Sequence, residues 1–378
     1  MTDKSNTSIS HGSLAEVASV FFRLGCLGFG GPAVHIAMME EEVVRKRKWI
    51  TTQHFLDLVG ATNLIPGPNS TEMTMHCGHE RAGWKGLIVA GGAFIVPAVM
   101  ITGAIAWVYE RYGTLPAVQP FLYGIKPAIL SVIVAMMISL GRRALKSVQL
   151  GVIGVIAAVL TLIGVNEIYV LLGSGLIGAV VHLIGERRNL NSLSPLILLA
   201  APLAAQISNW KLFLIFLKVG AILYGSGYVL FAFLDAELLE TGLLSRQVLI
   251  DAIAVGQFTP GPVSSAATFI GWQMGGLWGA LAATAGIFLP SFLFVAFLNP
   301  LIPRLRRSKV MSAFLDTVNI VSVAVILAVV VEMGRDSVQD WRTILIACLG
   351  FIITFVFRRL NSAFIVLGGA VLGYILSL

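Results

Sequence analysis

Two Pro-Gly-Pro triplets interrupt the hydrophobic sequence, and short polar residues follow each of them. A proline at a helix start lacks an N–H that would have no intrahelical acceptor, and glycine allows the preceding chain to bend. The residues are Pro66, Gly67, Pro68, Asn69, Ser70 and Thr71 in one copy, and Pro260, Gly261, Pro262, Ser264 and Ser265 in the other. Each triplet predicts a helix start, whose free N–H groups and dipole favour a bound anion. A kink in a packed helix, with the hydroxyls bonded to their own backbone, is the alternative.

Two glycine-rich stretches, GFGGPAVH at 28–35 and YGSGYV at 224–229, predict another break in each half of the chain, ahead of the triplet, and we call these two the first breaks. Bends of this kind allow a close approach of backbones and present amide groups that can bind an anion. The residues that we expect to contribute are Gly30, Gly31, Gly225 and Ser226. Close packing of helices through small residues is the alternative.

Arg23 and Lys218 lie at equivalent distances before these two breaks, inside hydrophobic sequence. Charged residues at membrane depth are costly, so a function is the first hypothesis for them. Two cations from opposite halves of the chain suit a divalent anion. Alternatively, each side chain extends to a membrane interface or pairs with an acid of its own half. Lys126, in YGIKPAIL, is a third candidate for binding the anion.

Acidic residues follow the first breaks, and they are candidates for carrying protons: Glu40, Glu42, Asp235 and Glu237. Solvated helix ends are the alternative for these four. Glu72 follows Asn69 by three residues, so it fits either a capping box or a proton relay.

Enzyme chemistry finds no support in the sequence. His76, His79 and Glu80 have a spacing that a metal could use, but no third cluster of ligands accompanies them, and the three cysteines are not paired in spacing. A nucleophile motif, an H-E-x-x-H motif and a phosphate-binding loop are missing from the sequence. We therefore expect no metal, no cofactor and no catalysis.

The elements that position these residues must lie in a membrane. Hydrophobic residues make up 57% of the 378 residues and charged residues only 12%, against about 25% charged in soluble domains. A bilayer crossing needs about 20 apolar residues. We expect such crossings near 86–108, 117–140, 148–165, 168–185 and 194–209, and then near 277–299, 311–332, 343–357 and 361–377. The sequence therefore predicts an all-α polytopic membrane protein.

Four further segments are interrupted near their middles by Gly or Pro, around 13–44, 52–80, 212–240 and 246–273. Full crossings by the first two would place the basic cluster at 45–48 outside, against the positive-inside rule. We therefore expect re-entrant helical hairpins, with full crossings as the alternative. The basic clusters and the N-terminus are then cytoplasmic, in the inner (plasma) membrane. The net charge of +7 follows from this topology and indicates no nucleic-acid partner.

The chain contains an internal repeat. Residues 22–44 match residues 217–239 at a shift of 195, the triplets match at a shift of 194, and Pro97 matches Pro290. Five expected crossings separate the copies, and an odd number inserts the second copy upside down. Inverted repeats are typical of secondary transporters, which bind their substrate at the repeat interface. We expect a disordered tail at 1–12, a first repeat at 13–190, a linker transmembrane helix at 191–210 and a second, inverted repeat at 211–378.

Several stretches together resemble the chromate ion transporter family of bacterial membrane proteins: FGGPAVHIAMMEEEVV, LIPGPNST, RAGWKG, YGSGYVL, DAIAVGQFTPGP and GIFLPSF. The resemblance covers both repeats and nearly the whole chain. It implies two oppositely oriented halves that move chromate out of the cytoplasm and confer chromate resistance, with sulfate as an isosteric competitor. Glu72 departs from the family pattern, in which a neutral amide is more common after LIPGPNST. This departure leaves the coupling ion open.

The sequence and the resemblance together predict a secondary active transporter for chromate. The dianion would lie between the two triplet helix starts, and export by alternating access would be coupled to the proton motive force. Uptake of sulfate or another oxyanion is the nearer alternative, and a passive anion channel is a more distant one. The expected partners are chromate, sulfate and the lipid bilayer, and a homodimer is a further hypothesis.

Overall fold

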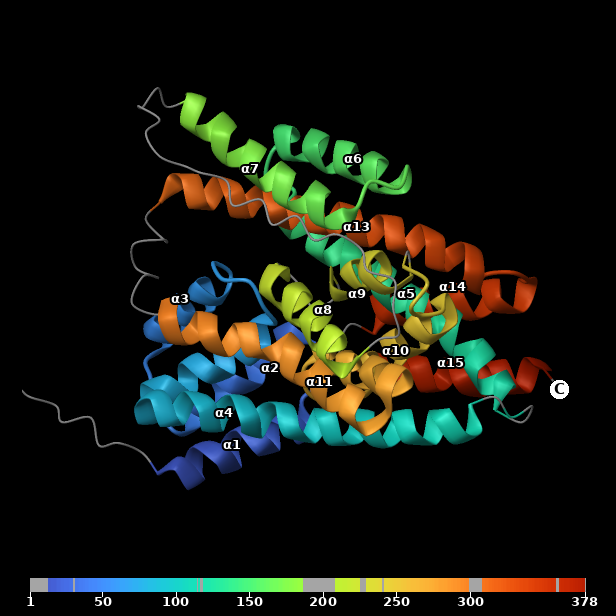
Figure 1. Ribbon diagram of the computed structural model, residues 1–378, viewed down its shortest axis with the longest axis horizontal. Coiled ribbons are helices and arrows are strands. Elements are labelled where there is room, and N and C mark those ends of the chain that lie inside the picture. Colours follow the sequence, from blue (N-terminus) through green and yellow to red (C-terminus); the bar gives the residue numbers. More distant parts are fainter. Residues whose placement is uncertain are drawn as a thin grey trace, which may run out of the picture.

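The computed structural model of the protein describes residues 13–29, 31–113, 115, 118–185, 208–224, 229–239, 241–298, 308–357 and 360–377. All regular secondary structure in these ranges is helical (Figure 1), as the sequence predicted. The predicted tail at 1–12 and most of the predicted linker at 191–210 lie outside the described residues. Gly30, Gly225 and Ser226 lie outside them as well.

The two halves of the chain run through the same series of elements. The first half contains α1 (Leu14–Leu27), α2 (Pro32–Met39), the π-helical turn η1 (Glu40–Lys46), α3 (Thr52–Thr62), α4 (Asn69–Tyr112), α5 (Gln119–Ala144), α6 (Val148–Leu162) and α7 (Glu167–Gly185). The second half contains α8 (Asn209–Ile222), α9 (Val229–Leu234), the π-helical turn η2 (Asp235–Leu239), α10 (Arg246–Phe258), the 3-10 turn η3 (Val263–Ser265), α11 (Ala266–Leu298), α13 (Lys309–Ser337), α14 (Trp341–Val356) and α15 (Ser362–Ser377).

Helix starts are capped at equivalent positions in the two halves. The Ser13 hydroxyl caps α1 and the Ser208 hydroxyl caps α8, each accepting from a backbone N–H of the first turn. Thr51 caps α3 and Ser245 caps α10 in the same way. Caps of this type satisfy donors that have no intrahelical acceptor. The local sequence therefore sets the same helix boundaries twice.

Four helical segments of the described chain are long and apolar enough to cross a membrane: α4, α5, α13 and Val263–Phe297, which comprises η3 and nearly all of α11. The helices α6, α14, α15 and the part of α7 from Glu167 to Val181 are shorter and also apolar. Every crossing expected from the sequence overlaps one of these helices, except 194–209, which falls mostly outside the described residues. The protein is a multi-pass membrane protein, as its composition indicated.

The backbone itself records the duplication. α4 bends at Ala82 (φ −142°, ψ 23°) and Gly83 (φ 61°, ψ −150°). α11 bends at Gly275 (φ −153°, ψ 23°) and Gly276 (φ 58°, ψ −148°). The second residue of each pair has a positive φ, which glycine adopts without steric cost. The same bend occurs at matching places, so the two halves are structural repeats.

The repeats meet through a reciprocal pair of hydrogen bonds. The Gly67 N–H of the first triplet donates to the Leu223 carbonyl at 2.6 Å, and the Gly261 N–H of the second donates to the Gly28 carbonyl at 2.7 Å. Gly28 and Leu223 are equivalent residues, directly after α1 and α8. Each triplet therefore binds the first break of the other repeat, which is the reciprocity that a twofold axis produces.

Long helices from both repeats form the centre of this interface. α4 packs against α11, α1 packs against α4, and α8 packs against α11. A Cβ at Gly25 would lie 2.6 Å from the Phe94 carbonyl oxygen, and one at Gly220 would lie 2.5 Å from that of Ile287. The helix pairs are therefore in backbone contact at matching glycines. In Figure 1, α6, α7 and α13 lie on the opposite side of the molecule from α1 and α4.

Candidate functional site

The first Pro-Gly-Pro triplet separates two helices. α3 ends at Thr62, and α4 begins at Asn69 with Pro68 as its N-cap residue. The N–H groups of Thr71 and Glu72 donate to the Pro68 carbonyl at 2.8 and 3.1 Å. The first N–H groups of a helix have no acceptor within it. The chain is therefore broken here between two helices and is not merely kinked within one.

The second triplet has the same place between α10 and α11. α10 ends at Phe258, and the short turn η3 follows Pro262 before α11 begins at Ala266. The Ser265 N–H donates to the Pro262 carbonyl at 2.9 Å. Both triplets thus begin a new helical segment, and the second begins it with one turn of 3-10 helix.

Polar side chains occupy the first turn of α4. Asn69 Nδ2 donates to Asn63 Oδ1 at 3.0 Å. Ser70 and Thr71 are buried, and Thr71 Oγ1 has no hydrogen-bond partner among the described residues. Leaving a buried hydroxyl unpaired costs about 1–3 kcal/mol, so a buried polar side chain normally has a partner. The Thr71 hydroxyl is available to a bound anion.

Glu72 is the most unusual side chain in this turn. It is 0% exposed, and the Ser291 hydroxyl faces its carboxyl group, which has no other hydrogen-bond partner within the described part of the chain. The sequence suggested a capping box with Asn69, in which the Glu72 carboxylate would accept a hydrogen bond from the backbone N–H of the N-cap residue. The N-cap residue is Pro68, which has no backbone N–H. The capping interpretation of Glu72 is therefore wrong.

The Glu72 carboxyl lies against Gly67 and Ser291. A Cβ at Gly67 would collide with Glu72 Oε1 and with Ser291 Oγ. Gly67 has a φ of 143°, and Ser291 is fully buried on α11, where Glu72 is the one polar partner that its Oγ faces among the described residues. Sequence reasoning missed Ser291, although a comparison of the repeats contains the signal: Pro290 is followed by Ser291, whereas Pro97 is followed by Ala98.

The start of α11 is equivalent in backbone but different in chemistry. A Cβ at Gly261 would lie 2.8 Å from the Ala98 Cβ. Thr102 Oγ1 donates to Ser265 Oγ at 3.2 Å, whereas Ser264 Oγ is buried without a partner among the described residues. Gly261 therefore packs against an apolar methyl group where Gly67 packs against a hydroxyl and a carboxyl.

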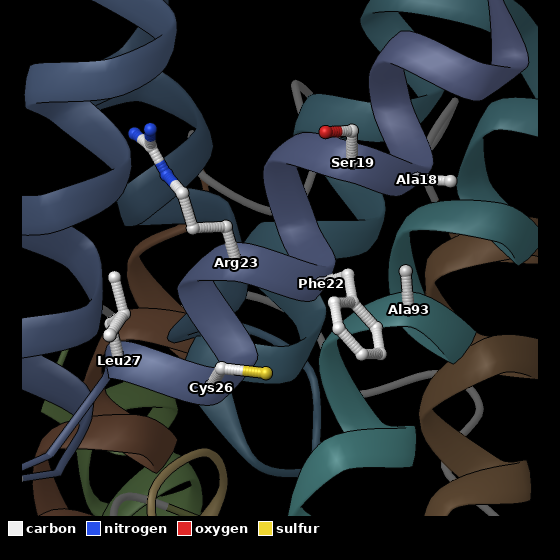
Figure 2. Close-up of a pocket in the computed structure, with 7 residues that line it drawn as sticks. All are labelled: Ala18, Ser19, Phe22, Arg23, Cys26, Leu27 and Ala93. Atoms are coloured by element: carbon white, nitrogen blue, oxygen red, sulfur yellow. The ribbon is translucent and has the colours of Figure 1, made fainter.

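Arg23 and Lys218 pair with acids of their own repeats. Arg23 Nη2 lies 2.7 Å from Glu42 Oε2, and Lys218 Nζ lies 2.6 Å from Glu237 Oε1. Their side chains are 54% and 42% exposed. Figure 2 shows Arg23 pointing away from Phe22, at the edge of a groove of about 570 Å³ on α1. The two cations thus have the own-repeat partners that the sequence left as an alternative.

Four of the five predicted proton carriers are in ion pairs, and the fifth, Glu72, is not in one within the described structure. The pairs are Glu40–Arg45 at 3.2 Å, Glu42–Arg47 at 3.1 Å, Asp235–Arg246 at 3.9 Å and Glu237–Lys218 at 2.6 Å. Carboxylates that face cations favour their charged form. Among these five residues, Glu72 is the one without an ion pair in the described structure.

Lys126 belongs to a separate polar cavity between the repeats. Lys126 Nζ, on α5, donates to Gln247 Oε1 at 2.5 Å, and Gln247 Nε2 donates to Asp251 Oδ2 at 2.8 Å. The cavity has a volume of about 330 Å³, and Arg246 also lines it. Arg246 in turn lies 2.6 Å from Glu332. The structure therefore does not bring Lys126 into contact with either triplet.

The first glycine-rich break contains a contact that sequence reasoning missed. His35 is buried, and its Nε2 lies 2.9 Å from the Gly28 carbonyl that also accepts from Gly261. Gly31, with a φ of 84°, precedes the first residue of α2. The equivalent of His35 in the second repeat is Leu230, so this contact belongs to one repeat only.

His76, His79 and Glu80 have a spacing that a metal could use, although the sequence led us to expect no metal there. Glu80 Oε2 lies 3.1 Å from His54 Nε2, on α3. In the described ranges, no three His, Cys, Asp or Glu side chains are grouped so that they could hold a metal ion.

Comparisons with known proteins extend over both halves of the chain. A protein-family model described as chromate transporter matches residues 15–179 and matches again at residues 210–374. The chain is similar to the probable chromate transport protein of Synechococcus elongatus, at 30% identity over 96% of this chain and 95% of that protein. The chain matches no solved structure.

Two further relatives have similar names and extents. The chromate transport protein of Cupriavidus metallidurans is 28% identical over 96% of this chain and 93% of its own length. The chromate transport protein of Pseudomonas aeruginosa is 28% identical over 96% of this chain and 92% of its own length. The similarity therefore includes both triplets and both first breaks.

Proposed function

The chain belongs to the chromate transporter family, and on this premise we propose that it exports chromate from the cytoplasm and thereby confers chromate resistance. Transport proceeds by alternating access, as one repeat rocks against the other around a central site. Chromate as the cargo agrees with the names of the relatives that match nearly the whole chain.

The observation that carries this proposal is the reciprocal pair of hydrogen bonds between triplets and breaks. Gly67 binds Leu223 and Gly261 binds Gly28, so two helix starts converge where the repeats meet. Helix starts bind anions through free N–H groups and the helix dipole. A tetrahedral dianion between α4 and α11 is held there by backbone and hydroxyl donors, and opening of either junction changes the side of access.

The binding residues we propose from the described part of the chain are Gly31, Gly67, Asn69, Ser70, Thr71, Gly261, Ser264 and Ser265. Gly30, Gly225 and Ser226, which lie outside the described residues, remain part of the proposal on the sequence pattern alone. Arg23 and Lys218 contribute charge to the dianion when their ion pairs with Glu42 and Glu237 open. Lys126 remains a further candidate for binding the anion, in its own cavity with Gln247 and Arg246.

The arrangement in the membrane is part of the same proposal. α1 with α2, α3 with the first part of α4, and the equivalent segments of the second repeat are re-entrant hairpins. The repeats are inverted relative to each other, with the N-terminus and the basic clusters in the cytoplasm, because this orientation obeys the positive-inside rule. The membrane is the cytoplasmic membrane, and a homodimer is a further hypothesis.

Labelled chromate uptake into inside-out vesicles tests the proposed function. We expect saturable accumulation that excess sulfate inhibits and that responds to the proton motive force. Flux that neither saturates nor depends on this force would indicate a passive channel. Chromate flux in the opposite direction, with growth on limiting sulfate, would indicate oxyanion uptake.

The charge contribution of Arg23 and Lys218 has its own test. We expect Arg23→Gln and Lys218→Gln each to lose chromate transport while inserting normally into the membrane. Full transport by both variants would remove these two residues from the binding site and leave the helix starts in place.

A further inference from the structure

Unpaired polar atoms gather at one of the two helix starts. At the start of α4, Thr71 Oγ1 is buried without a hydrogen-bond partner among the described residues, and the buried Glu72 carboxyl and Ser291 Oγ face each other with no other partner there. At the start of α11, only Ser264 Oγ is buried without a partner in the described structure. Buried polar groups are costly unless paired, so the start of α4 offers the proposed oxyanion site more side-chain groups than the start of α11 does.

Three differences between the repeats produce this contrast. Ser291 beside Gly67 corresponds to Ala98 beside Gly261. Thr102, which pairs with Ser265, corresponds to the buried Val295. Glu72 corresponds to Ala266 when counted from the triplet and to Ser265 when counted from the bend, and neither residue carries a carboxyl group. The duplicated backbone therefore presents donors at α4 and apolar or paired groups at α11.

The groups around Glu72 favour the protonated form of its carboxyl over the ionised form. Ser291 lies against it, and Tyr224, next to the Leu223 junction, interacts with it electrostatically. The cation on α1, Arg23, is paired with Glu42, and His35 on α2 contacts Gly28. An ionised carboxylate without a cation is strongly disfavoured in such a site. A protonated carboxyl carries an O–H, which makes it a hydrogen-bond donor.

We propose that protonated Glu72 donates a hydrogen bond to the oxyanion at the start of α4, so that one proton and one oxyanion occupy this site together. Ser291 and Thr71 supply two further O–H donors, and the helix start supplies N–H donors. This inference rests on the proposed function and specifies its coupling. Glu72 is thus a binding residue for the oxyanion as well as the group that holds the proton.

Shared occupancy sets the sign of the coupling. Because binding is reciprocal, the proton raises the affinity for the oxyanion and the oxyanion raises the affinity for the proton. A divalent oxyanion that moves with one proton carries one net negative charge. Export is then driven by the membrane potential and opposed by the inward pH gradient.

Proton uptake on binding is the first test, with the purified full chain and with chromate and sulfate as probes. We expect one proton to be taken up for each oxyanion bound. At pH values above the pKa of the Glu72 carboxyl, the affinity for the oxyanion should fall about tenfold per pH unit. Glu72→Gln keeps a donor of similar shape, so it should bind without proton uptake and without this pH dependence. Glu80→Gln, which removes a carboxyl from the same helix, is the matched control and should behave as wild type.

Flux in inside-out vesicles, whose interior is acidic and positive when energised, tests the sign directly. Nigericin collapses the pH gradient and should raise chromate accumulation, whereas valinomycin with potassium collapses the potential and should lower it. Accumulation by Glu72→Gln should not respond to nigericin.

Four outcomes would overturn this proposal. Binding without proton uptake by the wild type, or unchanged proton uptake by Glu72→Gln, contradicts it while the proposed function stands. Lower accumulation in nigericin indicates proton exchange in the opposite direction and also contradicts it. No binding of either probe by the wild type removes both the proposed function and this inference.

Discussion

The two triplet helix starts share a backbone and differ in chemistry. Gly67 and Gly261 each donate to the first break of the other repeat, at 2.6 and 2.7 Å. Ser291 and a carboxyl lie against the first glycine, and the methyl group of Ala98 lies against the second. After duplication, close backbone packing constrains the glycines and bends, whereas side chains at the interface can diverge. A nearly symmetric backbone frame can therefore hold an asymmetric set of side chains at the site.

Substitution of Gly67 or Gly261 by alanine should give the largest effect on transport, and it should distinguish the binding role of the first helix start from the packing role of the second. Gly67→Ala places a methyl group where Glu72 and Ser291 lie and imposes a φ of 143° on alanine, which costs about 1–3 kcal/mol. We expect chromate transport to fall at least about tenfold, because the methyl group occupies the binding region. Vesicle flux and thermal unfolding in detergent measure the two effects.

Gly261→Ala is the matched change in the second repeat. Its methyl group would lie 2.8 Å from the Ala98 Cβ, so Ala98→Gly in the same chain should recover part of the lost unfolding temperature. Equal loss of oxyanion affinity in both alanine variants would contradict the greater share in binding that we assign to the start of α4, with Glu72 and Ser291.

The ion pairs of the first breaks should respond unequally to loss of the cation. Glu42 has Arg47 and Lys46 within 3.1 and 3.6 Å besides Arg23, whereas the described contacts of Glu237 include one cation, Lys218. Lys218→Gln should therefore destabilise the protein by about 1 kcal/mol more than Arg23→Gln, a value reduced for solvent screening. Comparison of the unfolding temperatures checks this, and a larger loss in Arg23→Gln would contradict it.

Exchange of the Thr102 and Val295 pair should give a smaller effect. Thr102 donates a hydrogen bond to Ser265, and the equivalent residues on the other side are Val295 and Thr71. Val295→Thr would therefore offer Thr71 the hydroxyl partner that Ser265 already has. Thr71 would then be bonded within the protein, so we expect oxyanion affinity to fall by roughly two- to tenfold, the equivalent of one hydrogen bond. Thr102→Val should lower stability by about 1 kcal/mol and leave affinity unchanged. A binding isotherm with chromate distinguishes these outcomes.

The smallest expected difference is in the stability that the helix caps Ser147 and Asp340 contribute, and this difference depends on pH. Both residues are equivalent N-caps, of α6 and α14. Hydrogen bonds from the Tyr123 hydroxyl and the Thr343 N–H lower the pKa of Asp340 below its ordinary value. The stabilisation by this cap is therefore fully present above the ordinary pKa, about 3.9, and is lost as the pH falls through the lowered pKa.

Asp340→Ser gives the second repeat the cap of the first and should remove this part of the acid sensitivity. Thermal unfolding at pH 7 and at pH 3 measures it. The same dependence on pH in Asp340→Ser and in the wild type would exclude Asp340 as its source.

Sequence predicted the frame better than the chemistry of the site. The new helix at Asn69, the matching breaks and the duplication follow from Gly and Pro placement, because backbone rules act locally. Ser291 lies far from the triplet in sequence and meets Gly67 only through the packing of α4 on α11. The capping interpretation of Glu72 did not hold because Pro68 became the N-cap residue. Tertiary contacts therefore decide which polar groups are left without partners.

The position of bound chromate tests the central claim most directly. An experimental structure of the full chain with chromate, recorded at the chromium absorption edge, locates the metal atom of the anion by its anomalous scattering. The account predicts chromium at the start of α4, within hydrogen-bonding range of Glu72 and Ser291 through its oxygens. Chromium at the start of α11, or in the Arg23 groove or the Lys126 cavity with the α4 site empty, would contradict it.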